Sequence, residues 1–188
     1  RAARRKRAAT AYVRDGAIES VVTILRTHGS TFKTFRQIGN ICLYVLLIDQ
    51  DLSELMTDMS RAIGTKRKNY VARQLAVLFY EASFDLADLV GKGYRRTLSK
   101  YSMPQEWIDE LNDVTGKLKN FKETNRIFLK SIRNAVSAHR EHDAVTQYEL
   151  MCGIDPLEVI RLGPQFQAIV NQLMDLQMKL MNHSTTIA

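Results

Sequence analysis

A spacing of alternately four and three residues runs through the second half of the chain, from Trp107 to His139. The positions that share it are Trp107, Leu111, Val114, Leu118, Phe121, Asn125, Phe128, Ile132, Ala135 and His139. In an α-helix this spacing puts all of these side chains on one side, as in the seam of a coiled coil. Because a mostly apolar side must be buried against other helices, the spacing predicts a long helix within a helical bundle, with His139 facing inward.

Apolar residues recur at helical intervals in most of the remaining chain. Helices are predicted over about residues 12–27, 31–63, 70–90 and 155–181, with a loop or short helix around residues 144–151. The three prolines all lie in the second half, so the first half lacks the strongest helix breaker. We therefore expect an all-α fold, an antiparallel bundle of about five to seven helices.

Three features of the sequence predict where helices begin or end. Asp155 followed by Pro156 has the form of a helix start. The Gly-Pro pair at Pro164 predicts an interruption of the helix that follows. Asp51 and Glu54 have the form of a capping box, so the second predicted helix is either one helix or two.

Length and charge assign most of the chain to one domain. A chain of 188 residues, 45% of them hydrophobic, can bury one core, and we expect a single domain over residues 10–188. The basic arm, residues 1–9, carries five basic residues and so accounts for most of the net charge of +7. This arm is open to three interpretations: a phosphate-binding segment, a flexible terminus, or the end of a helix from a missing segment.

Location is constrained by the apolar runs and by the cysteines. The longest apolar run, at residues 41–48, is far shorter than the ~20 residues that cross a membrane. No secretory signal is visible. Cys42 and Cys152 are the only cysteines and lack C-x-x-C spacing, which is typical of reduced thiols in a cytoplasm. We expect a cytoplasmic protein, without membrane association, in which both thiols are free and buried.

The segment SIRNAVSAHREHD, residues 131–143, contains the candidate catalytic site. Asn134 directly follows Arg133, and His139 comes six residues after the arginine. An arginine at this distance from a histidine is expected about once by chance in such a chain, whereas the added asparagine lowers the expectation to roughly 0.04. The alternative is an ordinary helix with three polar side chains, in which the inward histidine is a hydrogen-bonded core residue.

A row of cations accompanies the candidate site. Lys119, Arg126, Arg133 and Arg140 recur every seven residues, about 100° around the helix from the seam. Such a row is usually charge in contact with solvent. Beside an inward histidine it can instead bind RNA phosphates next to a proton-transfer group, and Lys119, Arg126 and Arg140 are the candidate RNA-binding residues.

The residue types at the candidate site suit RNA cleavage without a metal ion. The imidazole of His139 titrates near neutral pH and can take the proton of the ribose 2′-hydroxyl or protonate the leaving 5′-oxygen. The guanidinium of Arg133 can neutralise the charge that grows on the phosphoryl oxygens, and Asn134 can bind the phosphate or orient the histidine. One histidine per chain is half of an acid and base pair, so the chemistry predicts a homodimer.

In a regular helix, Arg133 and His139 would point in different directions. Six residues correspond to about 120° around a helix and 9 Å along it, so Arg133 and His139 do not share a face. The arginine would have to bend back, or a groove between helices would have to gather both side chains.

The stretch IRNAVSAHRE, residues 132–141, resembles the R-x4-6-H motif of the HEPN superfamily, in which a polar residue follows the arginine. The similarity covers these ten residues and a helical pattern over most of residues 31–182. It implies a helical, usually dimeric, metal-independent endoribonuclease of toxin-antitoxin or other antiviral systems, with an antitoxin or defence-system protein as a possible partner. Arg133, Asn134 and His139 match the motif. Some toxins of the superfamily carry, two residues after the histidine, a tyrosine that a partner modifies; this chain departs from them with Glu141.

Two other functions stay open. A non-catalytic helical module would bind a partner protein or nucleic acid through the basic arm and the row of cations. A metal-dependent hydrolase would use Glu81, Asp85 and Asp88, which fall near one helix face, although a solvated acidic face is commoner. His139 and His142 alone offer too few donors for a metal site. Since the P-loop and G-x-G-x-x-G patterns do not occur, no cofactor is expected.

Overall fold

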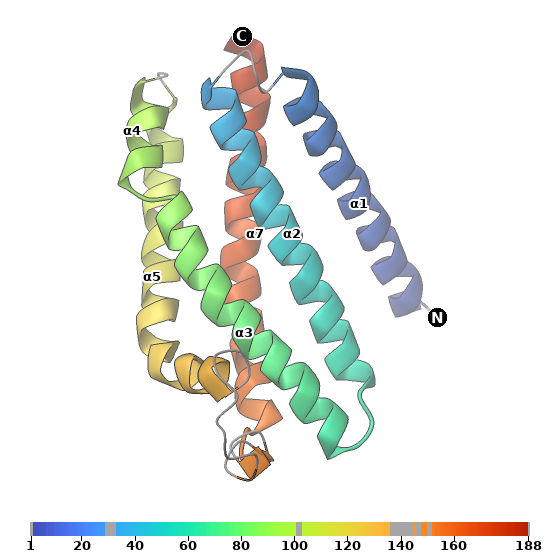
Figure 1. Ribbon diagram of the computed structural model, residues 1–188. Coiled ribbons are helices and arrows are strands. Elements are labelled where there is room, and N and C mark those ends of the chain that lie inside the picture. Colours follow the sequence, from blue (N-terminus) through green and yellow to red (C-terminus); the bar gives the residue numbers. More distant parts are fainter. Residues whose placement is uncertain are drawn as a thin grey trace. The chain divides into compact units, whose positions relative to one another are not determined.

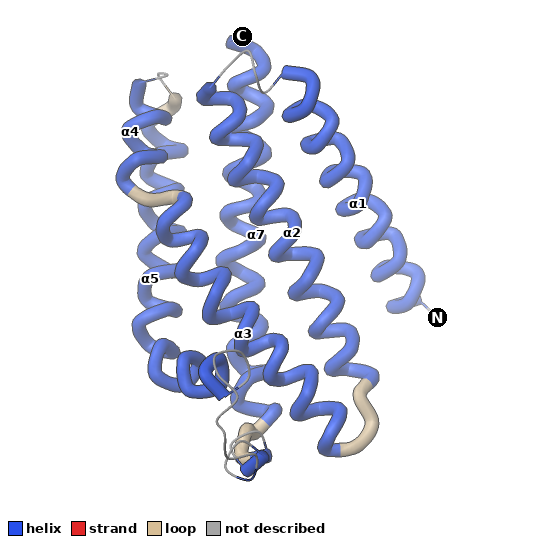
Figure 2. Tube along the Cα trace, viewed as in Figure 1, coloured by secondary structure: helices blue, strands red, loops and turns tan. Residues whose placement is uncertain are grey.

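Each of the elements that the structure describes is an α-helix. The computed structural model describes residues 2–28, 33–100, 103–135, 145, 148–149 and 152–187, and their side chains except at residues 2–10, 28, 33–35 and 185–187. Among the described residues there are six helices: α1 (Ala2–His28), α2 (Lys33–Arg61), α3 (Thr65–Leu89), α4 (Lys92–Lys100), α5 (Gln105–Arg133) and α7 (Pro156–Ile187) (Figures 1 and 2). The all-α prediction and the expected number of helices are confirmed. None of the described helices is both long and apolar enough to cross a membrane.

Helix α5 carries the predicted seam. The seam residues Leu111, Val114, Leu118, Phe121 and Ile132 are at most 3% exposed. The seam residues Trp107, Asn125, Phe128 and Ala135 are half-buried. The last seam position, His139, lies outside the described residues. The spacing therefore identified the buried side of this helix correctly as far as the structure describes it.

Helix α2 is continuous through the segment where a second helix could have begun. It runs past Asp51 without a break, so the capping-box pattern does not start a new helix here. Leu52, which follows directly, is fully buried, and Ile48 and Met59 are buried on either side of it. Continuous burial of one apolar side favours a single helix.

Helix α7 begins where the sequence predicted and continues where the sequence predicted a break. The backbone N–H of Leu157 donates to Asp155 Oδ1 at 2.9 Å, which confirms the predicted helix start. The interruption predicted at Pro164 is wrong, because the helix continues through it. Phe166 and Ile169 stay buried beyond the proline, and this burial offsets the backbone hydrogen bond that proline cannot make.

The chain divides into two compact units. Unit 1 comprises Arg1–Gln50, Leu89–Val114 and Val170–Ala188, and unit 2 comprises Asp51–Asp88 and Thr115–Ile169. The division falls inside α2, α5 and α7, so each unit holds part of these three helices. Helix α1 belongs to unit 1 and includes residues 2–9 of the basic arm. The single domain expected over residues 10–188 stays a prediction.

Within unit 1, a close approach and a buried ion pair join α1 to α2. A Cβ atom on Gly39 would lie 2.7 Å from Leu25 Cδ2, so glycine permits this approach without displacing the leucine. The buried Arg14 donates from Nη1 to the backbone oxygen of Asp49 at 3.0 Å. Its Nε lies 3.3 Å from Asp49 Oδ2, an ion-pair distance without the alignment of a hydrogen bond. This carboxylate compensates the buried guanidinium charge.

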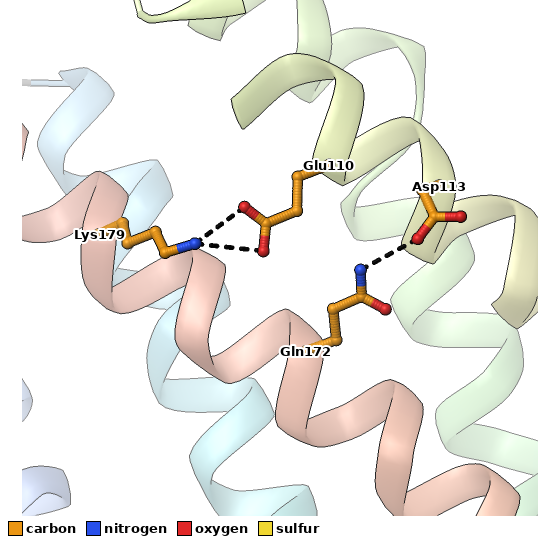
Figure 3. A network of polar contacts seen from close by, with 4 residues as sticks. All are labelled: Glu110, Asp113, Gln172 and Lys179. Carbon is orange, nitrogen blue, oxygen red and sulfur yellow. Dashed lines mark hydrogen bonds and ion pairs between the residues drawn. The ribbon is translucent and has the colours of Figure 1, made fainter. Parts of the chain in front are cut away.

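Polar contacts also attach α5 to α7 within unit 1. Glu110 accepts hydrogen bonds from Lys179 Nζ at 2.9 and 3.3 Å, and Asp113 Oδ2 accepts one from Gln172 Nε2 at 3.1 Å (Figure 3). All four contributing side chains come from the surface of the two helices, where such pairs add little stability but favour one register.

Three phenylalanines form the centre of the unit 2 core. Phe79 of α3, Phe121 of α5 and Phe166 of α7 are fully buried. Their ring centroids lie 5.1 to 6.1 Å apart in edge-on or tilted arrangements, the geometry that aromatic rings prefer. The cluster fixes α3 against α5 within this unit and so determines which of their surface residues meet.

The two cysteines differ in exposure. Cys42 is fully buried in unit 1, with its Sγ 3.8 Å from Met178 Sδ. Cys152 is exposed, so the prediction of a buried thiol is wrong there; it directly precedes the turn before α7, outside the buried sides of the helices. Burial disfavours the thiolate and raises the pKa of the Cys42 thiol from 9.0 to about 11.

A thiol reagent should therefore distinguish the two cysteines. At pH 8 the folded chain should react at Cys152 and not at Cys42, because the thiolate is the nucleophile and Cys42 is both covered and protonated. Since the folded state retains the Cys42 proton up to a pKa of about 11, stability should fall as the pH rises from 9.0 toward that value. Titration with Ellman's reagent, with Cys152→Ser as the control, measures how many thiols react in the folded protein. Rapid reaction of two thiols in the folded protein would contradict the burial of Cys42.

Candidate nucleic-acid interface

Five cations gather on one side of α5 within unit 2. We call Lys119, Lys122, Arg126, Lys130 and Arg133 the basic stripe. At 100° per residue these five positions fall within an arc of about 80°. Glu123 is the single acidic residue between Lys119 and Arg133, so this stretch has a net charge of +4. A helix side with this charge suits a polyanion.

The basic stripe lies next to the buried side of α5 and is accessible along its length. Lys119, Arg126 and Lys130 are exposed, whereas Lys122 and Arg133 are partly covered. The exposed positions keep their charges in water, while the adjacent side of the helix is buried in the core of unit 2. The sequence-predicted residues Lys119 and Arg126 thus lie on an open surface, where they are available to a ligand.

Two aromatic side chains of α3 lie beside this stripe. Tyr80 and Phe84, the aromatic pair, are one helical turn apart, and both are half-buried. Their ring centroids are 4.7 Å apart with the planes tilted by 36°. Lys122 Nζ lies 3.9 Å from the centroid of the Phe84 ring, and Arg133 Cζ lies 6.0 Å from that of Tyr80. Both ends of the aromatic pair therefore adjoin cations of the basic stripe.

Arg133 is held by a carboxylate of α3. Its Nε donates to Glu81 Oε1 at 2.8 Å, and the two side chains are 36% and 45% exposed. A guanidinium has five N–H donors, so the four on its terminal nitrogens take no part in this bond. The pair fixes the position of Arg133 at the end of α5 while leaving it in contact with solvent.

The same contact bears on the metal-dependent interpretation. Glu81 was one of its three candidate ligands with Asp85 and Asp88, and its carboxylate is engaged with Arg133. Asp85 has a polar or electrostatic interaction of its own. In the described part of the chain, no group of three or more His, Cys, Asp or Glu residues is arranged to hold a metal ion.

The regular α-helix ends at Arg133. Asn134 is exposed and, with Ala135, has π-helical rather than α-helical geometry. The separation of about 120° between Arg133 and His139 assumes a regular α-helix over residues 133–139, of which the structure describes residues 133–135. His139 and Arg140 lie outside the described residues. Of the predicted catalytic residues, the structure therefore describes Arg133 and its neighbour Asn134.

A surface cavity of about 420 Å³ in unit 2 is acidic, in contrast to the basic stripe. Its lining comprises Phe128, Ser131, Ile132, Glu149, Gly153, Ile154, Asp155 and Glu158. Three of these residues are acidic, and the described lining contains no lysine or arginine. Repulsion from the carboxylates disfavours phosphate binding here, which leaves the basic stripe as the better surface for an RNA strand.

Several residues of this candidate interface were not identified from the sequence. The seven-residue spacing identified Lys119, Arg126 and Arg133 but not Lys122 and Lys130. The latter two are found when each position is placed around the helix at 100° per residue. Tyr80 and Phe84 carry a weaker signal, a spacing of four residues that is equally typical of core residues. Their proximity to the stripe depends on the packing of α3 against α5.

The chain matches no protein-family model, no curated protein and no solved structure.

Proposed function

We propose that this chain is a metal-independent endoribonuclease of the HEPN type, with Arg133, Asn134 and His139 as its catalytic residues. The observation that carries the proposal is the fixed guanidinium of Arg133 at the end of the basic stripe. A strand whose phosphates follow the stripe would bring one of them to Arg133, six residues before the histidine of the motif. The sequence motif and the charge distribution therefore support the same site.

The reaction is an internal transfer at phosphorus. An imidazole of His139 takes the proton of the ribose 2′-hydroxyl, and the 2′-oxygen forms a bond to the adjacent phosphorus. The bond from phosphorus to the 5′-oxygen breaks, and a second, protonated imidazole supplies the proton that this oxygen needs. Arg133 stabilises the charge on the phosphoryl oxygens. The products are a 2′,3′-cyclic phosphate and a 5′-hydroxyl, so no water is consumed.

Glu81 is a positioning residue in this proposal. It binds Nε of Arg133 and leaves the terminal nitrogens of the guanidinium to a phosphate. A carboxylate also keeps the long arginine side chain from sampling many rotamers, which lowers the entropy lost when the phosphate binds.

The proposal includes a homodimer, because one histidine per chain cannot act as base and acid in the same turnover. Two protomers that meet near residues 133–139 would bring two imidazoles to one strand. Sedimentation of the intact chain should then give twice the mass of one chain, and a strict monomer would exclude the shared site. A nuclease of this kind would act in the cytoplasm, in a toxin-antitoxin or phage-defence system, restrained by an antitoxin or another protein of the system.

The competing function is a non-catalytic helical module. The same basic stripe supports binding of RNA without cleavage, and binding alone requires neither His139 nor a dimer. The two functions differ in whether intact RNA persists in the presence of the protein.

Incubation with RNA and excess EDTA tests the proposal. The wild-type chain should cleave RNA under these conditions, and His139→Ala should reduce the rate by about 100- to 10,000-fold because a group that moves the proton is lost. Arg161→Ala, which removes an exposed arginine of α7, is the matched control and should retain the wild-type rate. Intact RNA across substrates of varied sequence and structure would favour the binding module. Activity abolished by EDTA would favour a metal-dependent hydrolase.

A further inference from the structure

We infer that the aromatic pair, Tyr80 and Phe84, is a subsite on which an unpaired base of a single-stranded RNA stacks, while the basic stripe binds the adjoining phosphates. The inference rests on the proposed function for the identity of the ligand as RNA. It extends that function by assigning the binding surface to α3 as well as α5.

The aromatic pair differs from the aromatic residues of the unit 2 core. Phe79, Phe121 and Phe166 have no exposed surface, whereas Tyr80 and Phe84 are only half-buried. Two neighbouring aromatic residues that are partly exposed offer an apolar surface that a flat, apolar ligand face would cover. Nucleobases have such faces, and they stack on aromatic side chains whatever their sequence.

The cations beside the rings make the same surface specific for a nucleotide. Lys122 lies over the face of Phe84 and Arg133 lies near Tyr80. An ammonium is strongly hydrated, and a cation over a partly exposed ring is held weakly. A base can therefore replace Lys122 on the ring, and the released ammonium can pair with the phosphate of the same nucleotide. This exchange retains a partner for every charged group.

The geometry of the stripe favours a single strand over a duplex. From Lys119 to Arg133 the stripe extends about 21 Å along α5, at 1.5 Å per residue. A single strand can follow this line and turn one base toward α3, because its bases are free to unstack. In a duplex the bases are stacked on one another, so the cations could bind its phosphates but the aromatic pair would gain nothing. The contribution of the rings should therefore be confined to single strands.

Fluorescence anisotropy of labelled RNA tests the subsite. The probes are a short oligoadenylate and an RNA duplex of equal length, and His139→Ala is the background in EDTA so that RNA stays intact. Phe84→Leu should weaken binding of the oligoadenylate by about 10-fold, the typical loss of one stacking contact, and leave duplex binding unchanged. Tyr80→Leu should act in the same way, whereas Tyr80→Phe keeps the ring and should retain the affinity.

The matched control removes a charge of the basic stripe and leaves both aromatic rings intact. Lys119→Gln should weaken binding of both probes and reduce the slope of log affinity against log salt for the single strand by about 0.7, whereas Phe84→Leu should leave that slope unchanged. Equal losses on both probes for the leucine variants, or no loss in either, would overturn the subsite. Should Phe84→Leu not fold, the comparison of Tyr80→Leu with Tyr80→Phe decides the question.

Failure of the subsite is distinguishable from failure of the proposed function. RNA cleavage with no selective loss in the ring variants overturns the subsite alone. Selective loss of single-strand binding, in a chain that does not cleave RNA, supports the subsite and leaves the non-catalytic module as the function.

Discussion

The Arg133→Ala variant should cleave RNA about 100 to 1,000 times more slowly than the wild-type chain, the usual loss when one donor to the transition state is removed. The loss should appear in kcat, because the charge that Arg133 stabilises grows during the reaction. Single-turnover cleavage of a labelled RNA in EDTA measures it. Removal of Arg133 also frees Glu81, but both side chains are more than a third exposed, so this pair contributes only about 0 to 1 kcal/mol to folding.

Two controls separate the chemistry of Arg133 from its charge. Arg133→Lys keeps the charge but loses the planar set of donors, so its rate should fall between those of wild type and Arg133→Ala. Arg161→Ala removes an arginine from an exposed position of α7 and should leave the rate unchanged. If Arg133→Ala cleaved RNA at the wild-type rate, the guanidinium would have no part in the reaction.

Phe121→Ala should destabilise the protein by about 3 to 5 kcal/mol, the usual cost of a large side chain removed from a core. Its ring is fully buried and contacts Phe79 and Phe166, so the change leaves a cavity between α3, α5 and α7. Urea denaturation followed by circular dichroism measures the free energy of unfolding.

A control for Phe121→Ala lies on the same helix. Ile127 is 86% exposed, and Ile127→Ala should change the stability by no more than about 0.5 kcal/mol. If Phe121→Ala cost less than about 1 kcal/mol, the three rings would not form the centre of the unit 2 core. A large loss for Ile127→Ala would mean that this helix face is covered in solution.

The fold was predictable where the information is local. The spacing through Leu118 and Phe121 identifies the buried side of α5, because three and four residues are the intervals of one helical turn. The passage of α7 through Pro164 was not predictable, since it depends on how much surface Phe166 and its neighbours bury against other helices. Helix propensity disfavours proline at this position and burial favours a continuous helix. The sequence gives the propensity, but it does not give the packing against other helices.

The candidate site was likewise predictable only in its local part. Arg133 could be found from its neighbours in the sequence, because the motif is local. Its partner Glu81 lies 52 residues earlier, and the sequence assigned that carboxylate to an acidic face. The aromatic pair lies beside the basic stripe because α3 packs against α5, and the sequence does not show that packing. Long-range pairing of this kind cannot be read from spacing within one helix.

The measurement that tests the catalytic account most directly is the chemical identity of the new RNA ends. Mass spectrometry of a short RNA cleaved in EDTA should find a 2′,3′-cyclic phosphate on one fragment and a 5′-hydroxyl on the other, because the attacking group is the 2′-oxygen. A 3′-hydroxyl with a 5′-phosphate, formed by attack of water, would contradict it.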